Sequence, residues 1–270
     1  MNTTVLYHSD CADGFTAAWA AWLRLGVSAR FVPMRYGEAP PDVTGQDVFV
    51  LDFSFKREVM LEMKAKAKSL RVLDHHATAA EELRGLDFAT FDQEHSGAAM
   101  AWSFFHDGTP PPLLVQYVED RDLWRFKLPH SRERSAFISS CEFSFEVWQI
   151  VALRIGGEIA VAEGAAILRV LRQQIARRVK EASTVQLDGY DVPCVNVTEN
   201  VSEVLNELAL GKPFALGWYQ DKRGIYRYSL RANAGATIDV SEIAKRRGGG
   251  GHRLAAGFET STAPHCPKLP

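Results

Sequence analysis

Short apolar runs alternate with segments of helical spacing along the first 105 residues of the chain. The apolar runs predict β-strands at 4–7, 30–34, 47–51, 70–73 and 86–91. The segments between them predict helices at 15–25, 57–69 and 98–105. Because strands that alternate with helices pair in parallel, we predict a doubly wound parallel sheet for this part of the chain. Pro33 favours an edge position, or an early end, for its strand.

A different pattern begins after residue 105. Helices are predicted at 113–118 and over 144–183, with an interruption at Gly156-Gly157, and strand-like segments return after Val185. The predicted fold class is α/β, with an N-terminal doubly wound parallel-sheet domain and a smaller α/β C-terminal domain joined by a helical connector. The expected boundaries are 1–140 for the first domain, 141–184 for the connector, 185–262 for the second domain and 263–270 for a loose tail.

Polar side chains gather where three of the predicted strands end. The first cluster runs from His8 to Asp13, the second is Asp52, and the third is the Asp-His-His segment at 74–76. In open parallel sheets ligands bind outside the carboxyl ends of the strands, so we expect these clusters to converge on one edge. Burying several polar side chains together costs several kcal/mol unless they have partners, and a metal ion is the simplest partner.

The side chains of these clusters suit divalent transition metals. Mixed carboxylate and imidazole sets favour Mn²⁺, Fe²⁺, Co²⁺ or Zn²⁺ over Ca²⁺. The candidate ligands are His8, Asp10, Asp13, Asp52, Asp74, His75, His76 and Asp120. That set exceeds the needs of one ion. Two ions about 3.5–4 Å apart would lower the pKa of a bridging water and favour in-line displacement at phosphorus. The reaction predicted from the residues is phosphoester hydrolysis.

A run of four glycines, Gly248 to Gly251, precedes His252 in the last part of the chain. Glycine costs about 0.5–1 kcal/mol relative to alanine in regular structure, so the run predicts neither a helix nor a strand. The N–H groups of such a turn can cradle a phosphate or a terminal nucleotide. A flexible loop is the other interpretation, and the run alone does not decide between them.

Composition narrows the classes of function. The chain has 270 residues, 46% of them hydrophobic, and its net charge of -2 argues against a generally cationic nucleic-acid-binding surface. No run of 18 apolar residues occurs, and the N-terminus lacks the pattern of a signal peptide. The four cysteines are widely scattered, as reduced thiols would be. We therefore expect a cytoplasmic protein with no membrane span.

Two separated signatures resemble those of a known family. The Asp74-His75-His76 segment, together with His8, Asp13-Gly14, Asp52 and the Asp120 segment, resembles the four motifs of the DHH phosphoesterase superfamily. The segment GGGHRLAAG at 249–257 is similar to the GGGHxxAxG signature of the domain that accompanies it. The resemblance extends from about residue 4 to residue 259. It implies an N-terminal lobe that holds two divalent ions and a C-terminal lobe that holds the substrate. Mn²⁺ is the expected ion, with Co²⁺, Fe²⁺ and Mg²⁺ as alternatives.

The resemblance also implies a role for each matching metal ligand. His8 would bind the first ion and Asp13 the second, and Asp52 would bridge the two. His75 would bind the second ion together with Asp120.

The catalytic and substrate-binding roles are implied in the same way. His76 would contact the scissile phosphate or orient the nucleophilic water, and Asp74 would hold an imidazole from behind. Ser96, just before a predicted helix, is either an N-cap or a phosphate contact. The residues that would bind the nucleotide or phosphate end of the substrate are Arg231, Gly249, Gly250, Gly251 and His252.

Two motifs are ambiguous. Cys11 falls where the family leads us to expect an Asp. Either Asp10 supplies the remaining ligand of the first ion, or that ion has fewer protein ligands, or Cys11 itself binds a softer ion. In the fourth motif we prefer Asp120, although Asp122 is two residues away and would otherwise pair with a neighbouring arginine.

The leading functional hypothesis is a dinuclear-metal phosphodiesterase that cuts short single-stranded oligonucleotides or linear dinucleotides to mononucleotides. The long insertions expected of a processive RecJ-like exonuclease are absent from this chain. One alternative is a polyphosphatase or pyrophosphatase, and another is a non-catalytic nucleotide-binding module whose metal site has decayed. The expected partner is the oligonucleotide or dinucleotide substrate, and a homodimer is compatible with the sequence.

Overall fold

In the N-terminal sheet, the strand β1 (Thr3–His8) has a neighbouring strand on each side. In the computed structural model, which describes residues 2–261, five strands run parallel in the order β2-β1-β3-β4-β5. The other strands span Ala29–Met34 (β2), Asp47–Leu51 (β3), Ser69–Asp74 (β4) and Ala89–Phe91 (β5). Pro33 lies in β2 at the sheet edge, because proline has no N–H to donate to a second neighbour. The predicted tail at 263–270 lies outside the described residues.

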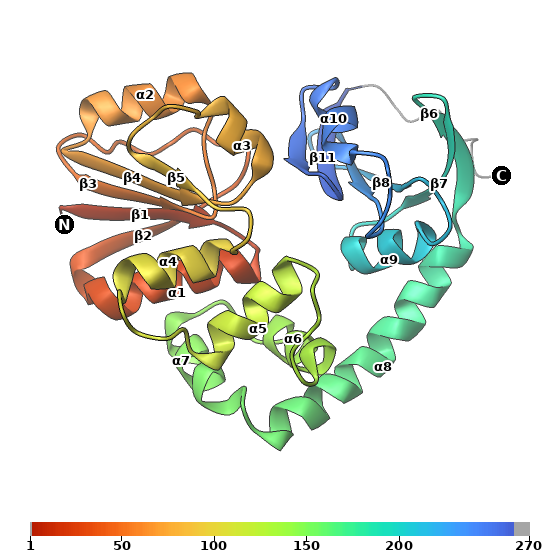
Figure 1. Cartoon of the computed structure of the whole chain (residues 1–270), viewed down its shortest axis with the longest axis horizontal. Helices are drawn as coiled ribbons and strands as arrows, with labels where there is room; N and C mark the ends of the chain where they lie inside the picture. The colour runs from red at the N-terminus through yellow and green to blue at the C-terminus, as the bar shows by residue number, and fades with distance from the viewer. Residues whose placement is uncertain (1, 262–270) are drawn as a thin grey trace. The chain divides into compact units, whose positions relative to one another are not determined.

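Helices cover both faces of this sheet (Figure 1). On one face lie α1 (Ala12–Leu25) and α4 (Gly97–Phe105), which contact each other along their length. On the other face lie α2 (Arg57–Lys66) and α3 (Ala77–Glu82). Two separate apolar clusters fill the two layers, since strands covered on both faces bury alternate side chains in opposite directions. The predicted doubly wound parallel sheet is confirmed.

Further helices extend the layer beside α1. They are α5 (Leu113–Asp122), α6 (Ser131–Ser139) and α7 (Phe145–Arg154), and a short 3₁₀ turn at Gly26–Ser28 follows α1. Trp148 of α7 is fully buried, and its indole N–H donates to the Thr16 hydroxyl at 3.0 Å. Its ring meets that of Phe15 edge-on at 5.0 Å between centroids. These contacts anchor the helices that follow the sheet to α1, which carries part of the candidate site.

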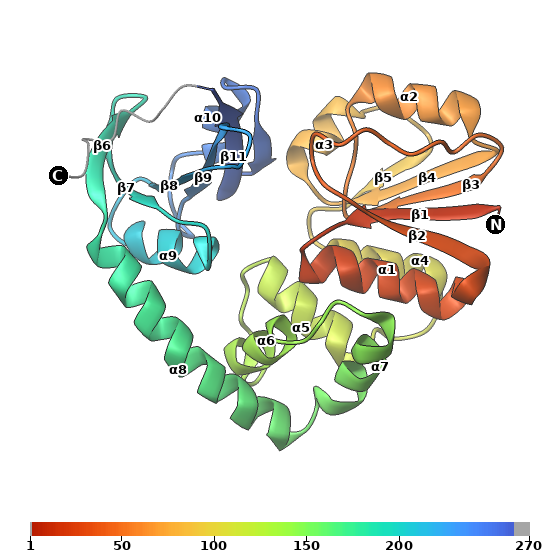
Figure 2. The ribbon, with the colours of Figure 1, turned by 180° about the vertical axis from the view of Figure 1, so that it is seen from behind.

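The chain divides into two compact units within α8 (Glu158–Lys180), the first ending at Leu168 and the second beginning at Arg169. The second unit contains a six-stranded mixed sheet in the order β10-β11-β9-β8-β7-β6, in which only β7 and β8 pair in parallel among the described residues. Figure 2 shows this sheet with α9 and α10. The strands span Ser183–Leu187 (β6), Tyr190–Asn196 (β7), Ala215–Gln220 (β8), Tyr226–Arg231 (β9), Gly250–His252 (β10) and Ala255–Thr260 (β11). The helices are α9 (Val201–Leu208) and α10 (Val240–Lys245). The predicted α/β fold class is confirmed for this unit as well.

The glycine run is not simply a loop, and the prediction that it forms no strand is wrong. Gly250 and Gly251 belong to β10, which pairs with β11 in an antiparallel hairpin. A Cβ on Gly249 would lie 2.1 Å from the carbonyl oxygen of Gly257, and one on Gly251 would lie 2.5 Å from that of Ala255. Gly251 also has a φ of 139°, which L-residues rarely adopt. Close packing between two strands therefore requires glycine here.

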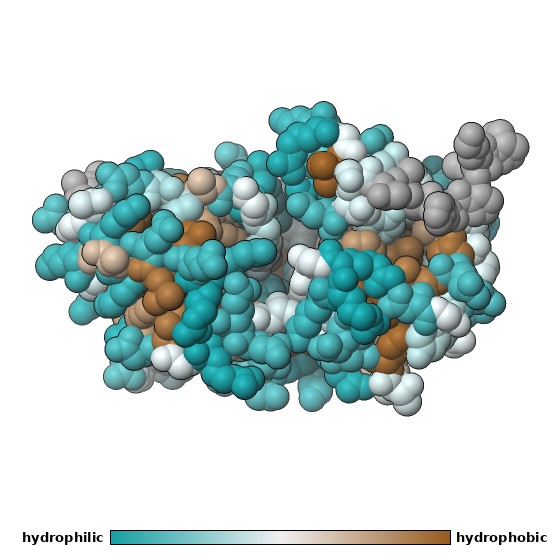
Figure 3. All heavy atoms as spheres, turned by 90° about the horizontal axis from the view of Figure 1, so that it is seen from above, coloured by the Kyte–Doolittle hydropathy of each residue, from teal (hydrophilic) through white to brown (hydrophobic). Residues whose placement is uncertain are grey.

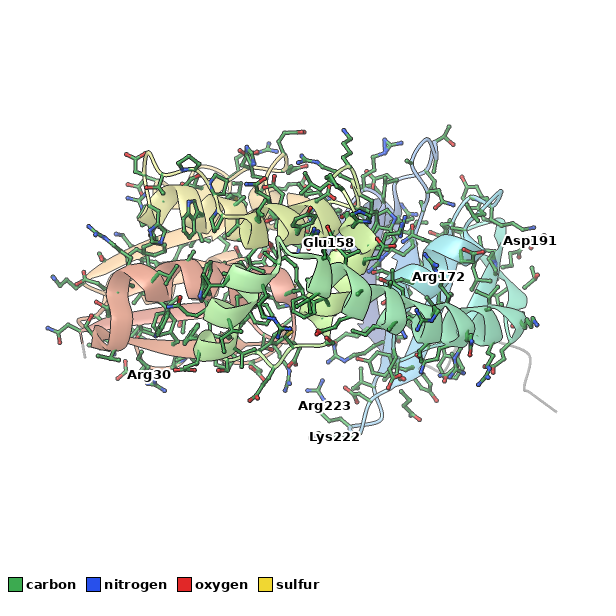
Figure 4. The ribbon with its side chains drawn as sticks, turned by 90° about the horizontal axis from the view of Figure 1, so that it is seen from below. Arg30, Glu158, Arg172, Asp191, Lys222 and Arg223 are labelled. Carbon is green, nitrogen blue, oxygen red and sulfur yellow. The ribbon has the colours of Figure 1, made fainter. Side chains whose placement is uncertain are left out.

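The face of the molecule that Figure 3 displays is mainly polar. Hydrophilic residues cover most of the face seen from above, and hydrophobic residues show between them in small groups (Figure 3). The basic side chains of α8 from Arg169 to Lys180 are exposed, and Arg172 is labelled among them in Figure 4. Lys222 and Arg223 lie at the tip of the loop between β8 and β9 (Figure 4). Within residues 2–261, no helix has both the length and the apolar character needed to cross a membrane.

Candidate functional site

The carboxyl edge of the parallel sheet carries a dense group of ionisable side chains. His8 is the last residue of β1, Asp52 directly follows β3, and Asp74 ends β4. The Nδ1 of His8 lies 3.5 Å from Oδ2 of Asp52, and the Nε2 of His75 lies 3.2 Å from Oδ1 of Asp52. The side chain of Asp52 is 2% exposed. The strand ends thus bring three sequence-distant motifs together around one buried carboxylate.

Three carboxylates surround the imidazole of His75. Besides Asp52, its Nε2 lies 3.8 Å from Oδ2 of Asp13 and 3.6 Å from Oδ2 of Asp122. The side chains of His75 and Asp13 are almost fully buried, whereas that of Asp122 is 28% exposed. Ligand atoms of Asp13, His75 and Asp122 all lie within 4.8 Å of one another. One nitrogen and several carboxylate oxygens in such a space are a donor set that fits a divalent metal ion.

The electrostatics of this group favour the addition of positive charge. Burial and the neighbouring charges of Asp52 and Asp122 raise the pKa of Asp13 well above its usual range. Burial and Asp52 likewise raise the pKa of Asp122, against the opposing effect of His75. For His75, burial lowers the pKa, but the hydrogen bond with Asp52 and the charges of Asp13 and Asp122 outweigh it and raise the pKa. The cluster is therefore most stable when it holds protons or a cation, and a divalent cation supplies that charge without protonation.

The start of α4 holds two of these carboxylates in place. The backbone N–H of Gly97 donates to Oδ2 of Asp13 at 2.7 Å, and that of Ala98 donates to Oδ1 at 3.0 Å. Both are N–H groups that a helix leaves without intrahelical partners. A Cβ on Gly97 would lie 2.4 Å from the Cβ of Asp52, so only glycine leaves room for that side chain. Gly14 plays the same part beside His8, whose carbonyl oxygen would lie 2.3 Å from an added Cβ.

The side chain of Asp74 is buried, and its carboxylate holds the imidazole ring of His76 in place. Its Oδ1 accepts from the Nδ1 side of His76 at 2.7 Å and from the backbone N–H of His75 at 2.7 Å. Its Oδ2 accepts the hydroxyl of Ser54 at 2.5 Å. Burial raises the pKa of the Asp74 carboxyl, but the charge and hydrogen bond of His76 outweigh this and lower it. The residue is fully buried, so it acts on the site through the orientation of the His76 ring.

In the first motif, His8 and Asp13 lie in the cluster as predicted, and Cys11 and Asp10 differ in their positions. The sulfur of Cys11, together with ligand atoms of His8 and Asp52, forms a group within 4.8 Å. Asp10, by contrast, has a φ of 54°, and its Oδ2 accepts two hydrogen bonds from the exposed Arg35 guanidinium, at 2.8 and 2.5 Å. The structure therefore places the sulfur of Cys11, and not the carboxylate of Asp10, beside His8 and Asp52.

The two carboxylates of the fourth motif also lie in different surroundings. The carboxylate of Asp120 is buried and accepts the backbone N–H groups of Lys127 at 2.9 Å and Leu128 at 3.2 Å, as well as the hydroxyl of Ser131. It therefore closes the loop between α5 and α6. Asp122, two residues later, faces His75 instead. The structure therefore places Asp122, and not the preferred Asp120, beside His75, because contacts with residues up to 11 positions away hold the carboxylate of Asp120.

Two further positions frame the site. Ser96 is fully buried, and its hydroxyl accepts from the N–H of Ala99 as the N-cap of α4. Tyr36 was not singled out from the sequence. Its ring, 49% exposed, meets those of His8, Phe53 and His76 at centroid distances of 5.3, 4.9 and 6.2 Å. No motif marks it, and only the pairing of β2 beside β1 brings it there.

The residues expected to bind substrate in the second unit share one row of its sheet. His252 pairs with Ala255 across the β10–β11 hairpin, and Ala255 pairs with Arg231 on β9. Directly paired residues point to the same face of a sheet. The Arg231 guanidinium hydrogen-bonds to the Ser202 hydroxyl at 3.0 Å and to the carbonyl oxygen of Leu230 at 2.9 Å. The glycines before His252 serve the strand packing described above, which needs no ligand.

Comparison with known proteins finds solved structures that share this fold. No protein-family model matches the chain. Uncharacterized protein R106 of Acanthamoeba polyphaga mimivirus is 29% identical over 291 residues, covering 97% of this chain and 68% of that protein. Among solved structures, the pGpG-specific phosphodiesterase PggH from Vibrio cholerae is similar with a TM-score of 0.52 and 12% identity, over 96% of this chain and 93% of that one. An exopolyphosphatase-related protein from Bacteroides fragilis is similar with a TM-score of 0.50 and 14% identity, over 97% and 87% of the two chains.

The chain therefore shares its fold with a pGpG-specific phosphodiesterase and an exopolyphosphatase-related protein. The Asp-His-His segment begins at the last residue of β4 and contributes to the buried acidic cluster. The glycine-rich signature lies in the β10–β11 hairpin of the second unit. Both signatures recognised in the sequence therefore occupy defined positions in the structure, one in each compact unit.

Proposed function

We propose that the protein is a metal-dependent phosphodiesterase that hydrolyses short single-stranded oligonucleotides or linear dinucleotides to mononucleotides. The observation that carries the proposal is the group of three carboxylates packed around His75 at the carboxyl edge of the parallel sheet. Buried like charges at such short distances are costly without a cation. Among proteins of the same fold are a pGpG-specific phosphodiesterase and an exopolyphosphatase-related protein, both named for chemistry at phosphorus.

The metal ligands follow from the two groups of donors. Asp13, His75 and Asp122 would hold one ion, and His8 and Asp52 would hold a second, with Asp52 near both. Divalent ions of the Mn²⁺ class, when bound, supply a water of lowered pKa and stabilise charge on the phosphate oxygens.

The protein itself contributes orientation and proton handling. Asp74 fixes the ring of His76 by accepting a hydrogen bond from Nδ1, so that Nε2 can donate toward a phosphate oxygen when the imidazole is protonated. In His76, burial lowers the pKa, but the charge and hydrogen bond of Asp74 raise it further than burial lowers it. A protonated His76 would stabilise negative charge that develops on the phosphate during displacement. The gain would be larger in the transition state than in the ground state.

The second unit would bind the anionic end of the substrate. His252 and Arg231 lie in one row of the sheet on either side of the small residue Ala255. Arginine and histidine are both donors suited to phosphate. A substrate of only a few nucleotides would need no extended cationic track, which agrees with the net charge of -2.

The test is hydrolysis by the purified full-length protein. With Mn²⁺ and end-labelled oligonucleotides of two to five residues, we expect mononucleotide products. Asp52→Asn should lower the rate by about a hundredfold or more, because it removes charge from the carboxylate nearest to both histidines. Inorganic polyphosphate and pyrophosphate are assayed in parallel, and phosphate release from these without nucleotide turnover would contradict the proposal.

A matched control lies on the same strand. Asp47 is at the opposite end of β3, where it pairs with Lys68 and accepts the Ser69 hydroxyl. Asp47→Asn should keep the wild-type rate. Equal losses in both variants would point to damaged folding, and a wild-type protein inactive on every oligonucleotide would refute the proposed substrate class.

A further inference from the structure

The two donor groups at the sheet edge differ in chemical character. Asp13, His75 and Asp122 offer carboxylate oxygens and an imidazole nitrogen, which suit hard or borderline ions. His8, Cys11 and Asp52 offer nitrogen, sulfur and oxygen, with ligand atoms within 4.8 Å of one another. A thiol in place of a carboxylate changes which ion such a position prefers, because sulfur is a soft ligand.

Cys11 is the N-cap of α1, with φ and ψ of -130° and 131°. Ser, Thr, Asp and Asn are strongly preferred at N-caps. This helix has a cysteine there instead, and its sulfur lies next to His8 and Asp52.

The fold holds the neighbours of the sulfur firmly. Asp52 is buried at 1% exposure, has a φ of 54°, and donates its backbone N–H to the carbonyl oxygen of Leu73 at 2.9 Å. His8 is fixed at the end of β1, with Gly14 packed against its carbonyl group. The three donors thus come from β1, the start of α1 and the end of β3, and none lies on a long flexible loop.

We propose that Cys11 is a metal ligand and that the position formed by His8, Cys11 and Asp52 takes a softer ion, of the Fe²⁺, Co²⁺ or Zn²⁺ class. The position formed by Asp13, His75 and Asp122 takes an ion of the Mn²⁺ class. This inference rests on the metal site of the proposed function and refines it, since it assigns different ions to the two positions.

Cobalt is a direct probe of the sulfur. The full-length protein is stripped of metal with a chelator and titrated with Co²⁺ while its absorption spectrum is recorded. A bond between thiolate and Co²⁺ gives a charge-transfer band in the near ultraviolet, which oxygen and nitrogen ligands do not produce. We expect this band in the wild type and its loss in Cys11→Ser.

Cys141→Ser is the matched control. Cys141 is also a partly buried cysteine of the first unit, but its sulfur contacts the carbonyl oxygen of Phe137 at 3.3 Å, outside the cluster. This variant should keep the band. Cys11→Asp tests selectivity, because a carboxylate there should still bind an ion. Its affinity for Mn²⁺ relative to Zn²⁺, measured by competition, should rise by about tenfold or more.

The outcomes separate the two proposals. Co²⁺ binding without the band, or a band that survives in Cys11→Ser, overturns the role of Cys11 and leaves the metal site intact. A wild type that binds neither Co²⁺, Zn²⁺ nor Mn²⁺ overturns the metal-dependent function itself, and with it this inference. An unchanged Mn²⁺ to Zn²⁺ preference in Cys11→Asp overturns the assignment of a softer ion to this position.

Discussion

Asp120 and Asp122 are two residues apart and should respond to the same substitution in opposite ways. Asp120→Asn removes charge from a buried carboxylate that accepts the N–H groups of Lys127 and Leu128 and the hydroxyl of Ser131. In either orientation, the amide NH₂ faces at least one of these donors. A hydrogen bond to a charged group contributes about 1.5–3 kcal/mol, so the variant should lose about 2–3 kcal/mol of stability. For a unit of this size, that lowers Tm by roughly 5–10 °C.

Asp122→Asn should leave the metal-free protein almost unchanged. Its carboxylate is 28% exposed and sits 3.6 Å from His75, where attraction to the imidazole opposes repulsion from Asp52. We expect, however, that added metal no longer raises the Tm of this variant. An ion present at a hundred times its Kd stabilises the folded state by about 2.7 kcal/mol, and a hundredfold weaker Kd reduces that to about 0.4 kcal/mol.

The assay is thermal unfolding of each variant after chelation, with and without added Mn²⁺, combined with metal analysis of the loaded protein. Asp120→Asn should melt early but keep its metal-induced rise in Tm, and Asp122→Asn should melt like the metal-free wild type and show no rise. If Asp120→Asn loses the metal response at an unchanged Tm while Asp122→Asn retains it, the assignment of the two carboxylates is refuted.

Three other substitutions test the supporting structure. Gly97→Ala should abolish metal binding while the fold survives in circular dichroism, because its Cβ would lie 2.4 Å from that of Asp52; normal metal content would count against this. Asp188 accepts hydrogen bonds from Arg247 and Arg246, and these lower its pKa to about 2, below the usual value near 3.9. The ionised carboxylate of Asp188 therefore stabilises the folded state above the unfolded-state pKa. This stabilisation is lost as pH falls through the folded-state pKa of about 2. Asp188→Asn should cost about 1 kcal/mol at pH 7, allowing for solvent screening, and the cost should vanish only well below the folded-state pKa of about 2, as measured by chemical denaturation. Gly249→Ala should lower Tm while leaving metal binding to the first unit unchanged, and an unaltered Tm would argue against the close strand packing.

The sheet and its polar edge were predictable because both depend on local patterns. Alternating strands and helices imply parallel pairing, and parallel pairing places every strand end on one edge. That rule alone brings His8, Asp52 and the 74–76 segment together, as the structure has them. Pro33 at the sheet edge follows equally from the chemistry of a single residue.

The features that local patterns could not predict depend on contacts between residues distant in the sequence. Residues two apart on a helix point in widely different directions, so only one of Asp120 and Asp122 can face the cluster. Which one does so is decided by the loop that ends at Ser131. Asp10 turns away because it adopts a left-handed conformation and meets Arg35, and neither is visible in the motif. The glycine run became a strand because another strand lies against it.

The backbone at Asp52 gives a physical reason to regard the acidic cluster as a functional site. A non-glycine residue at a φ of 54° costs roughly 1–2 kcal/mol, and Asp52 also carries a buried charge close to the carboxylate of Asp13. Core packing alone would favour an apolar side chain at the end of β3. The fold instead keeps glycine at position 97 to make room for this one. Strain, buried like charge and a dedicated glycine all coincide on a single carboxylate, and binding of a cation is the event that would offset all three costs.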